Sequence, residues 1–411
     1  MARDEIAVVQ LLWELLNRKT GELGNVSFLP QKPAYNKDIV VEQPFERSTP
    51  EEQGISSEYI ADMVRELRNC SAAHMHQLMI IRNKHVIYEG GFSPYPAGVW
   101  HVTYSMCKSV TNMAIGFLVD DGRLKLEDHL IDFIEPESLI DRVKMKDITI
   151  RNMLTMSTGV AFNETGAISG NDWVNGYFRS KVKFTPGSQF EYNSMNTYML
   201  SAIVGKITGV TMFEFLKPRL FEPLGITQVF WEESPQGITK GGWGLFIRQE
   251  DAAKLGQLYM QKGIWNGKRI ISEKWIEEST KLQIQPDKDD GYGYHIWMDV
   301  RPESFTYNGM LGQNVHCYPD IDTIVVTNAG NGEVFQGGRM TTIIRKYFGP
   351  DFHPADKLEP NPAAFHFLEV AKREAEGTIY RPDSIEGGGW SRASRRRKDN
   401  KKIQDTKSLL N

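Results

Sequence analysis

Residues 105–122 have the sequence SMCKSVTNMAIGFLVDDG, in which Ser105 and Lys108 precede a long apolar run. The run predicts a helix over Ser109–Val119, and two aspartates followed by Gly122 are typical of a helix C-terminus. If the serine stands at the helix start, a spacing of three residues puts both side chains on one face. The positive end of the helix dipole then favours negative charge that develops beside the serine.

A serine hydroxyl is a poor nucleophile and needs a partner that takes its proton as it attacks. Lys108 could do this as a neutral amine, and it is the only basic residue between positions 102 and 121. The S-x-x-K pattern alone is weak, because a serine N-cap followed by a solvated lysine produces the same spacing by chance. The surrounding segments therefore decide whether Ser105 is a nucleophile.

Apolar runs on both sides of this helix predict strands. Residues 78–81 and 85–88 flank a polar turn and predict a β-hairpin, whereas residues 123–290 are mostly helical in their periodicity. Past residue 290, short β-branched or aromatic segments predict strands at 294–300, 305–309, 315–318 and 323–327. We therefore expect a mixed α/β (α+β) fold, in which one antiparallel sheet forms from both ends of the chain and helices flank it. The gap between this sheet and the helical insertion is where a site should lie.

Three regions are predicted along the chain: an N-terminal helix and arm (1–45), a main domain (46–350) with a helical insertion (about 123–290), and a C-terminal extension (351–411). The arm begins with an amphipathic helix, Ile6–Leu16, and Ser48-Thr49-Pro50 opens a second helix. The extension contains a predicted helix, Ala363–Arg373, followed by a basic cluster between Arg392 and Lys402. We interpret this cluster as a disordered, solvated tail rather than a patch for nucleic acid or membrane.

The composition is that of an ordinary soluble globular protein, with 411 residues, 40% of them hydrophobic, and a formal net charge of −4. Such a balance creates no field that attracts nucleic acid or membranes. Cys70, Cys107 and Cys317 are too few for a disulfide framework and fit a reducing compartment. The N-terminus lacks the features of a secretory signal, and no stretch approaches the roughly 20 apolar residues of a membrane span. We expect a cytoplasmic protein of open oligomeric state.

Four segments carry a more specific signal because they occur in a fixed order: SMCKSVTNMAIGFLVDDGRLKLED from Ser105, ITIRNMLTMSTG at 148–159, PGSQFEYNS at 186–194, and GWGL at 242–245 with Asp251. Together they resemble the serine β-lactamase and penicillin-binding-protein superfamily, in particular the class C β-lactamases and their esterase and amidase relatives. The resemblance covers residues 45 to 345. It implies a β-lactamase/transpeptidase-like fold and two-step acyl transfer without a metal or an organic cofactor.

The resemblance also implies roles for single residues. Ser105 is the acylated nucleophile, Lys108 helps to deprotonate it, and Tyr192 relays protons between the serine and the leaving group. The third residue of the tyrosine motif is usually asparagine, but this chain has Ser194 there and Asn193 in the middle. Either of these two residues could make the motif's contact with the substrate, Asn193 by a small change of register.

The superfamily's third motif, K-T-G or H-x-G on a strand that faces the serine, corresponds to Tyr307-Asn308-Gly309. Gly309 would let the backbone approach the substrate, and the N–H of Met310 would join that of Ser105 in an oxyanion hole. Tyr307 replaces the usual cation, and its phenol can donate a hydrogen bond but carries no charge. Penicillins present a carboxylate, so this change favours a neutral ester or amide substrate.

Some alternatives stay open. The thiol of Cys107 is a conceivable nucleophile, but two residues after Ser105 it should point away and pack instead. His74 and His76 form an H-x-H pair that could ligate zinc, although no third ligand lies nearby in the sequence, and we expect no metal site. The rival functions are a D-amino-acid peptidase or other penicillin-recognising enzyme of the same fold, and a non-catalytic binding module.

Overall fold

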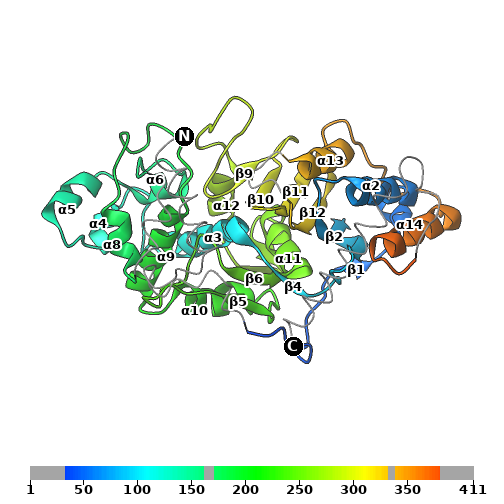
Figure 1. Ribbon diagram of the computed structural model, residues 1–411, viewed down its shortest axis with the longest axis horizontal. Coiled ribbons are helices and arrows are strands. Elements are labelled where there is room, and N and C mark those ends of the chain that lie inside the picture. The colour runs from blue at the N-terminus through cyan, green and yellow to red at the C-terminus, as the bar shows by residue number, and fades with distance from the viewer. Residues whose placement is uncertain (1–32, 162–170, 332–337, 380–411) are drawn as a thin grey trace, which may run out of the picture.

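The computed structural model describes residues 33–161, 171–331 and 338–379. The predicted N-terminal helix and the basic cluster lie outside these ranges. Figure 1 shows a sheet near the centre, a group of helices on one side that belongs to the middle of the chain, and a second group on the other side that contains both α2 and α14.

One seven-stranded sheet organises the molecule, in the order β1-β3-β2-β12-β11-β10-β9. Every neighbouring pair is antiparallel except β1 and β3, which are parallel. Strands from the start and the end of the chain meet at the β2–β12 pair, so the predicted assembly from both ends is confirmed. The strands are β1 (Glu46–Arg47), β2 (Met75–Arg82), β3 (His85–Gly91), β9 (Trp297–Met298), β10 (Phe305–Gly309), β11 (Gln313–Tyr318) and β12 (Thr323–Ala329).

The predicted hairpin is β2–β3, and its tight turn consists of Asn83 and Lys84 with φ of +48° and +63°. Positive φ at both central residues matches the right-handed twist of the strands. Alternate residues of β2 enter two different cores, with Met79 on one face and Ile80 on the other. Because both faces are covered, β2 is a nearly continuous apolar run rather than an alternating one.

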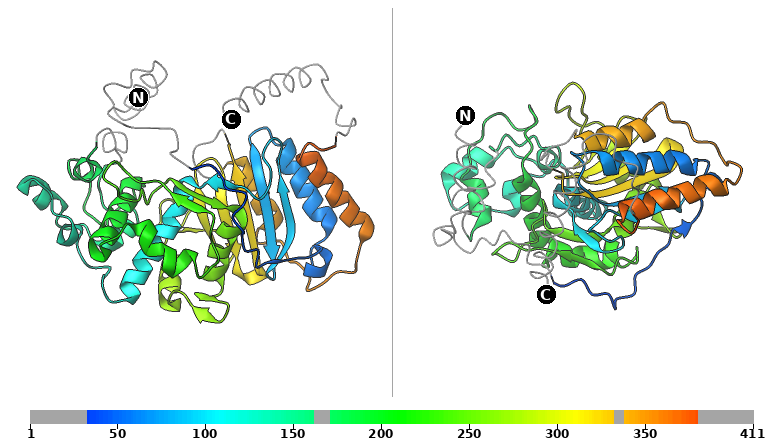
Figure 2. Two further views of the ribbon diagram at one scale, coloured as in Figure 1. Left: turned by 90° about the horizontal axis from the view of Figure 1, so that it is seen from below. Right: turned by 45° about the vertical axis from the view of Figure 1, so that its right-hand side comes forward.

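Three helices cover one face of the sheet: α2 (Ser57–Asn69), α13 (Arg339–Phe348) and α14 (Pro362–Ala375). The helix predicted to open at Ser48 begins later, because Gly54 at φ +73° ends a short 3₁₀ turn and Ser56 caps α2. Helix α14 packs on α2 (Figure 2), although the predicted domain boundary at residue 350 leaves it outside the main domain. That boundary stays a prediction.

The opposite face is covered by α3 (Lys108–Asp120) and α11 (Gln249–Met260), and beyond them lies the helical region. This region is less purely helical than expected, since it contains a small antiparallel sheet in the order β4-β6-β5. Its strand β4 (Trp100–Val102) leads directly into the Ser105 turn. The remaining elements are α4 (Leu130–Phe133), α5 (Leu139–Met145), α6 (Ile150–Leu154), α8 (Trp173–Phe178), α9 (Ser194–Thr208), α10 (Met212–Leu216), α12 (Glu273–Thr280), β5 (Val229–Trp231), β6 (Leu245–Arg248), β7 (Ile264–Trp265) and β8 (Lys268–Arg269).

Within the described ranges, no single helix has the length and apolar character needed to cross a membrane. Helix α9 and the segment Met212–Phe221 are together long and apolar enough for a membrane span, but the chain bends by 72° between them. Both parts contribute side chains to the buried core of the helical region.

Candidate active site

Ser105 lies in a 3₁₀ turn, Tyr104–Cys107, that runs directly into α3. Tyr104, just before the serine, has φ of +45°, a conformation that non-glycine residues rarely adopt. Strained backbone of this kind persists only where surrounding structure holds it. The strand β4 before the turn and the helix after it supply that support, and the turn sets Ser105 in front of the lysine.

Lys108 is the centre of the site. Its Nζ lies 2.8 Å from Ser105 Oγ, 3.0 Å from Ser194 Oγ and 2.8 Å from the carbonyl oxygen of Gly242. The side chain is 1% exposed, and no carboxylate in the described part of the chain forms an ion pair with it. The lysine is therefore surrounded by two hydroxyls and a carbonyl, all of which are uncharged.

Gly242 belongs to the GWGL segment of the family resemblance, but the sequence assigned neither it nor Gly241 a part in the site. A Cβ on Gly242 would lie 2.7 Å from the Ser194 carbonyl oxygen, and one on Gly241 would lie 2.8 Å from that of Thr197. Only glycine lets this loop press against α9 so closely. The loop thereby aims the Gly242 carbonyl at Lys108, a contribution that leaves no side-chain signal in the sequence.

Ser194, and not Asn193, contacts the lysine. The Asn193 side chain accepts the Met195 N–H at the start of α9 and donates to the Val160 carbonyl at 3.1 Å. It is thus the N-cap of α9. The expectation that Asn193 might reach the substrate is corrected, because its amide is already used by backbone groups.

Tyr192 lies beside the lysine, with Lys108 Nζ 4.9 Å from the centre of its ring. The tyrosine ring also stacks on Trp297 at 6.3 Å between centroids and 24° between planes. Trp297, on β9, is a site residue that the sequence did not reveal. The phenol is thus positioned next to the Ser105–Lys108 pair, and its role as a proton relay stays a prediction.

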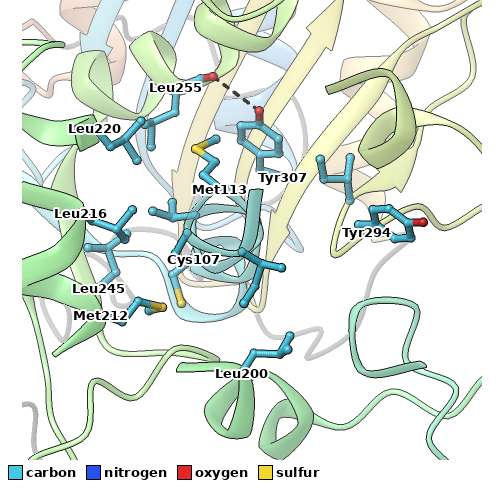
Figure 3. Close-up of a cluster of buried hydrophobic side chains, with 14 of the residues drawn as sticks. Cys107, Met113, Leu200, Met212, Leu216, Leu220, Leu245, Leu255, Tyr294 and Tyr307 are labelled. Atoms are coloured by element: carbon cyan, nitrogen blue, oxygen red, sulfur yellow. Dashed lines mark hydrogen bonds between the residues drawn. The ribbon is translucent and has the colours of Figure 1, made fainter. Parts of the chain in front are cut away.

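Tyr307 does not face the site, so the expectation that its phenol donates a hydrogen bond to substrate is wrong. Its side chain is buried, packs against Tyr259 and points toward the Leu255 carbonyl of α11 at 3.4 Å (Figure 3). The reason is strand alternation, since Phe305 and Tyr307 both point into the apolar core between β10 and α11. Phenol burial also raises the pKa of Tyr307 well above its usual value.

Gly309 does approach the nucleophile. A Cβ there would lie 2.2 Å from the Thr103 carbonyl oxygen and 3.0 Å from the Met106 nitrogen. The absence of a side chain lets the end of β10 touch the turn that carries Ser105. Met310, the next residue, therefore follows the strand at the point closest to that turn, and its oxyanion role stays a prediction.

Cys107 faces away from the site, as expected. Its Sγ lies 3.2 Å from the Gly241 carbonyl oxygen, and the side chain packs among apolar residues that include Leu245 and Met212 (Figure 3). Burial raises the pKa of the thiol to about 12. A thiol that holds its proton so strongly is not a nucleophile near neutral pH.

His295 lies behind the lysine and was also missed from the sequence. Its Nε2 is 3.2 Å from the Met153 carbonyl oxygen and 3.3 Å from Thr197 Oγ1, and its own carbonyl accepts the Ser109 hydroxyl. The imidazole therefore joins α6 to α9, which carries Ser194, and the backbone carbonyl of His295 adds a contact to α3, which carries Lys108. Burial and the nearby Lys108 lower the pKa of His295 to about 3, so the ring is neutral.

His74 and His76 are not part of a metal-binding group. Among the described residues, no three histidine, cysteine or acidic side chains lie close enough together to hold an ion. His76 Nδ1 lies instead 2.7 Å from His101 Nε2, and its ring stacks on Tyr95. Burial, together with His101 and His74, lowers the pKa of His76 to about 3.

Comparisons with known proteins agree with this architecture. Residues 61–337 match the sequence profile of the family described as Beta-lactamase. The chain is 23% identical over 287 residues to the 6-aminohexanoate-dimer hydrolase of Paenarthrobacter ureafaciens, covering 60% of this chain and 70% of that protein.

Two solved structures share the fold. One from Bacillus anthracis, provisionally named a 6-aminohexanoate-dimer hydrolase, superposes with a TM-score of 0.63 at 18% identity over 82% of this chain and 92% of that one. EstCE1, described as a hydrolase with promiscuous acyltransferase activity, superposes with a TM-score of 0.58 at 14% identity over 71% and 99% of the two chains. At 18% and 14% identity, the two structures support the fold alone.

Proposed function

This chain belongs to the beta-lactamase family and is a serine hydrolase, and we propose that it transfers an acyl group to Ser105 with Lys108 as the base. The observation that carries the proposal is the 2.8 Å contact between Lys108 Nζ and Ser105 Oγ, at a lysine with which no carboxylate among the described residues forms an ion pair. A buried lysine that has only neutral neighbours can exchange a proton without stranding a partner charge.

Lys108 Nζ is within hydrogen-bond distance of three oxygens, Ser105 Oγ, Ser194 Oγ and the Gly242 carbonyl, and donates to each of them. For the base role we propose a neutral amine, which has two hydrogens and one lone pair. The Gly242 carbonyl and Ser194 Oγ would keep the two hydrogens, and the contact with Ser105 would reverse, so that its hydroxyl donates to the lone pair. This arrangement leaves the Ser105 oxygen ready to attack as its proton moves to Lys108.

The reaction then proceeds in two steps. Ser105 Oγ forms a bond to the substrate carbonyl carbon while its proton passes to Lys108, and the bond to the leaving group breaks as that group takes up a proton. Water next attacks the acyl-enzyme, releases the acid and restores Ser105. Tyr192, beside Lys108, is the group proposed to carry protons to the leaving group and from the water.

We propose a neutral ester or a linear amide as the substrate rather than a β-lactam. Support comes from the third motif, where the family's cation is absent and Tyr307 is turned into the core. The Paenarthrobacter relative, named for a 6-aminohexanoate dimer, supports a linear amide in the same way. A non-catalytic binding module explains less, because it has no need for a buried lysine beside a serine.

The test is covalent labelling by a fluorophosphonate together with turnover of short aryl esters. We expect the unaltered chain to be labelled and to cleave such esters faster than nitrocefin, whereas Ser105→Ala loses both labelling and turnover. Ser71→Ala, at an exposed serine between α2 and β2, is the matched control and should behave like the unaltered chain. Undiminished labelling of Ser105→Ala would overturn the nucleophile, and rapid nitrocefin hydrolysis would overturn the substrate preference.

A further inference from the structure

The turn between β10 and β11 carries Met310, whose N–H is predicted to bind the substrate's carbonyl oxygen as negative charge develops there. Among the described residues, none accepts a hydrogen bond from this N–H. Gly309, just before it, touches the turn of Ser105, because a Cβ at Gly309 would lie 3.0 Å from Met106 N. A free backbone donor therefore lies where β10 meets the nucleophile's turn.

The backbone of this turn is unusual. Leu311 has φ of +65° and Gly312 has φ of +98°, so two consecutive residues lie in the left-handed region. Leucine rarely adopts that conformation, and it persists only where the surrounding structure holds it. A Cβ on Gly312 would lie 2.7 Å from Asn331 Nδ2, so the turn also packs closely against the residues that follow β12. The position of the Met310 N–H therefore depends on what holds the turn.

All three carbonyl groups of the turn accept hydrogen bonds. The carbonyl of Met310 accepts from Gln313 Nε2 at 3.4 Å, that of Leu311 accepts from the Asn331 backbone N–H at 3.0 Å, and that of Gly312 accepts from Thr327 Oγ1 at 3.0 Å. Two of the three donors are side chains, Gln313 and Thr327, and both are 0% exposed. A peptide plane whose carbonyl is held cannot rotate freely, so these bonds fix the shape of the turn.

Thr327 stands at the end of a line of hydrogen bonds that crosses three strands. It lies opposite Asn314 on β11, which lies opposite Asn308 on β10. Asn308 Nδ2 donates to Asn314 Oδ1 at 2.6 Å, and Asn314 Nδ2 donates to Thr327 Oγ1 at 3.3 Å. Because Thr327 Oγ1 accepts from Asn314, its single hydrogen is directed to the Gly312 carbonyl.

We propose that Thr327 is a positioning residue for the oxyanion hole. Its hydroxyl holds Gly312, and with it the β10–β11 turn, in the form that keeps the Met310 N–H beside Ser105. The inference rests on the proposed acyl transfer to Ser105 and on Met310 as an oxyanion donor. A looser turn weakens the stabilisation of the negatively charged intermediate more than the binding of substrate, so kcat falls while KM changes little.

The test compares an aryl ester with its thionoester, in which sulfur replaces the carbonyl oxygen. Sulfur accepts hydrogen bonds weakly, so an oxyanion hole favours the oxygen ester. Thr327→Val keeps nearly the same shape but removes the hydroxyl. It should lower kcat for the oxygen ester, and the oxygen-to-sulfur ratio of kcat/KM, by about tenfold, with KM within about twofold. Thr327→Ser keeps the hydroxyl and should recover most of both losses.

Thr323→Val is the matched control. Thr323 lies on the same strand, is also 0% exposed, and donates its hydroxyl to the Ile321 carbonyl at 2.8 Å. It stands at the other end of β12, opposite Arg82, so its variant should keep the oxygen-to-sulfur ratio. Gln313→Met releases the Met310 carbonyl and should lower the ratio in the same direction as Thr327→Val. This second variant tests the turn if Thr327→Val does not fold.

The two esters separate a positioning role from a merely structural one. A ratio that stays unchanged in Thr327→Val and Gln313→Met, because both esters slow alike, would overturn the positioning role while hydrolysis stands. An equal fall of the ratio in Thr323→Val would overturn it too, since that bond does not reach the turn. Absence of both fluorophosphonate labelling and turnover in the unaltered chain would instead overturn the proposed function, and the role of Thr327 with it.

Discussion

Helices α3 and α11 each bury a lysine against the same core, but they surround it differently. Lys108 and Lys254 are 1% and 0% exposed. Lys254 Nζ lies 2.7 Å from the carboxylate of Asp251, which Arg248 also approaches at 3.7 Å. Lys108 has two serine hydroxyls and the Gly242 carbonyl as partners. The same residue type therefore pairs with a carboxylate in α11 and with uncharged oxygen atoms in α3.

The difference shows what makes a buried lysine suited to chemistry. Loss of the proton from a buried lysine opposite a carboxylate would leave the carboxylate charge unpaired, which is strongly unfavourable. A lysine that contacts only uncharged groups leaves no charged partner unpaired when its proton moves. Lys254 joins α11 to the Gly225 loop, where its Nζ donates to the carbonyl. Lys108 places its Nζ next to Ser105 Oγ, where we propose that it accepts the hydroxyl proton.

The largest effect expected from this comparison is that of Lys108→Met on catalysis. Loss of the base should lower kcat/KM for an aryl ester by about a thousandfold. The free energy of unfolding should fall by at most about 1 kcal/mol, because the lost hydrogen bonds are offset by no longer burying an amine. Urea unfolding and steady-state kinetics on one preparation measure both. Activity within tenfold of the unaltered chain would remove Lys108 from the mechanism.

Lys254→Met should show the reverse pattern. Asp251 would keep only the distant Arg248, so unfolding should become easier by about 3 kcal/mol. The kcat/KM of the folded fraction should stay within about twofold, since Lys254 contacts no site residue. The same two measurements decide the outcome. An unchanged urea midpoint would contradict the stabilising role of Lys254. A catalytic loss as large as that of Lys108→Met would contradict the claim that only Lys108 serves catalysis.

Much of the architecture could be predicted because local sequence patterns specify the helices and strands. The hairpin at Asn83, the late strands and the helix after Ser105 follow from apolar periodicity, and the order of the motifs placed Ser105, Lys108 and Tyr192 in one site. The error at Tyr307 arose because a motif match does not fix which face of a strand a side chain takes. Asn193 was ambiguous for a related reason, since a helix N-cap and a substrate contact both favour asparagine.

The remaining site residues were missed because their contributions depend on backbone groups and on tertiary packing, which leave no pattern in the sequence. Gly242 acts through a backbone carbonyl, which every residue has. His295 bridges helices whose packing no local pattern specifies. Trp297 lies on β9 and reaches the site only once β9 pairs with β10, where it is opposite Thr306. Its position depends on strand register, which the sequence alone left undetermined.

The smallest effect should come from Cys107→Ala, which examines the residue next to the lysine in the chain. Cys107 Sγ contacts the Gly241 carbonyl and Lys108 Nζ contacts that of Gly242, so two consecutive residues contact two consecutive carbonyls of the same loop. Only the second contact touches the nucleophile. Cys107→Ala should therefore cost about 1 kcal/mol in unfolding free energy and leave kcat/KM within about twofold. A catalytic loss near that of Lys108→Met would show that the Gly241–Gly242 loop needs both contacts to keep the Gly242 carbonyl on the lysine.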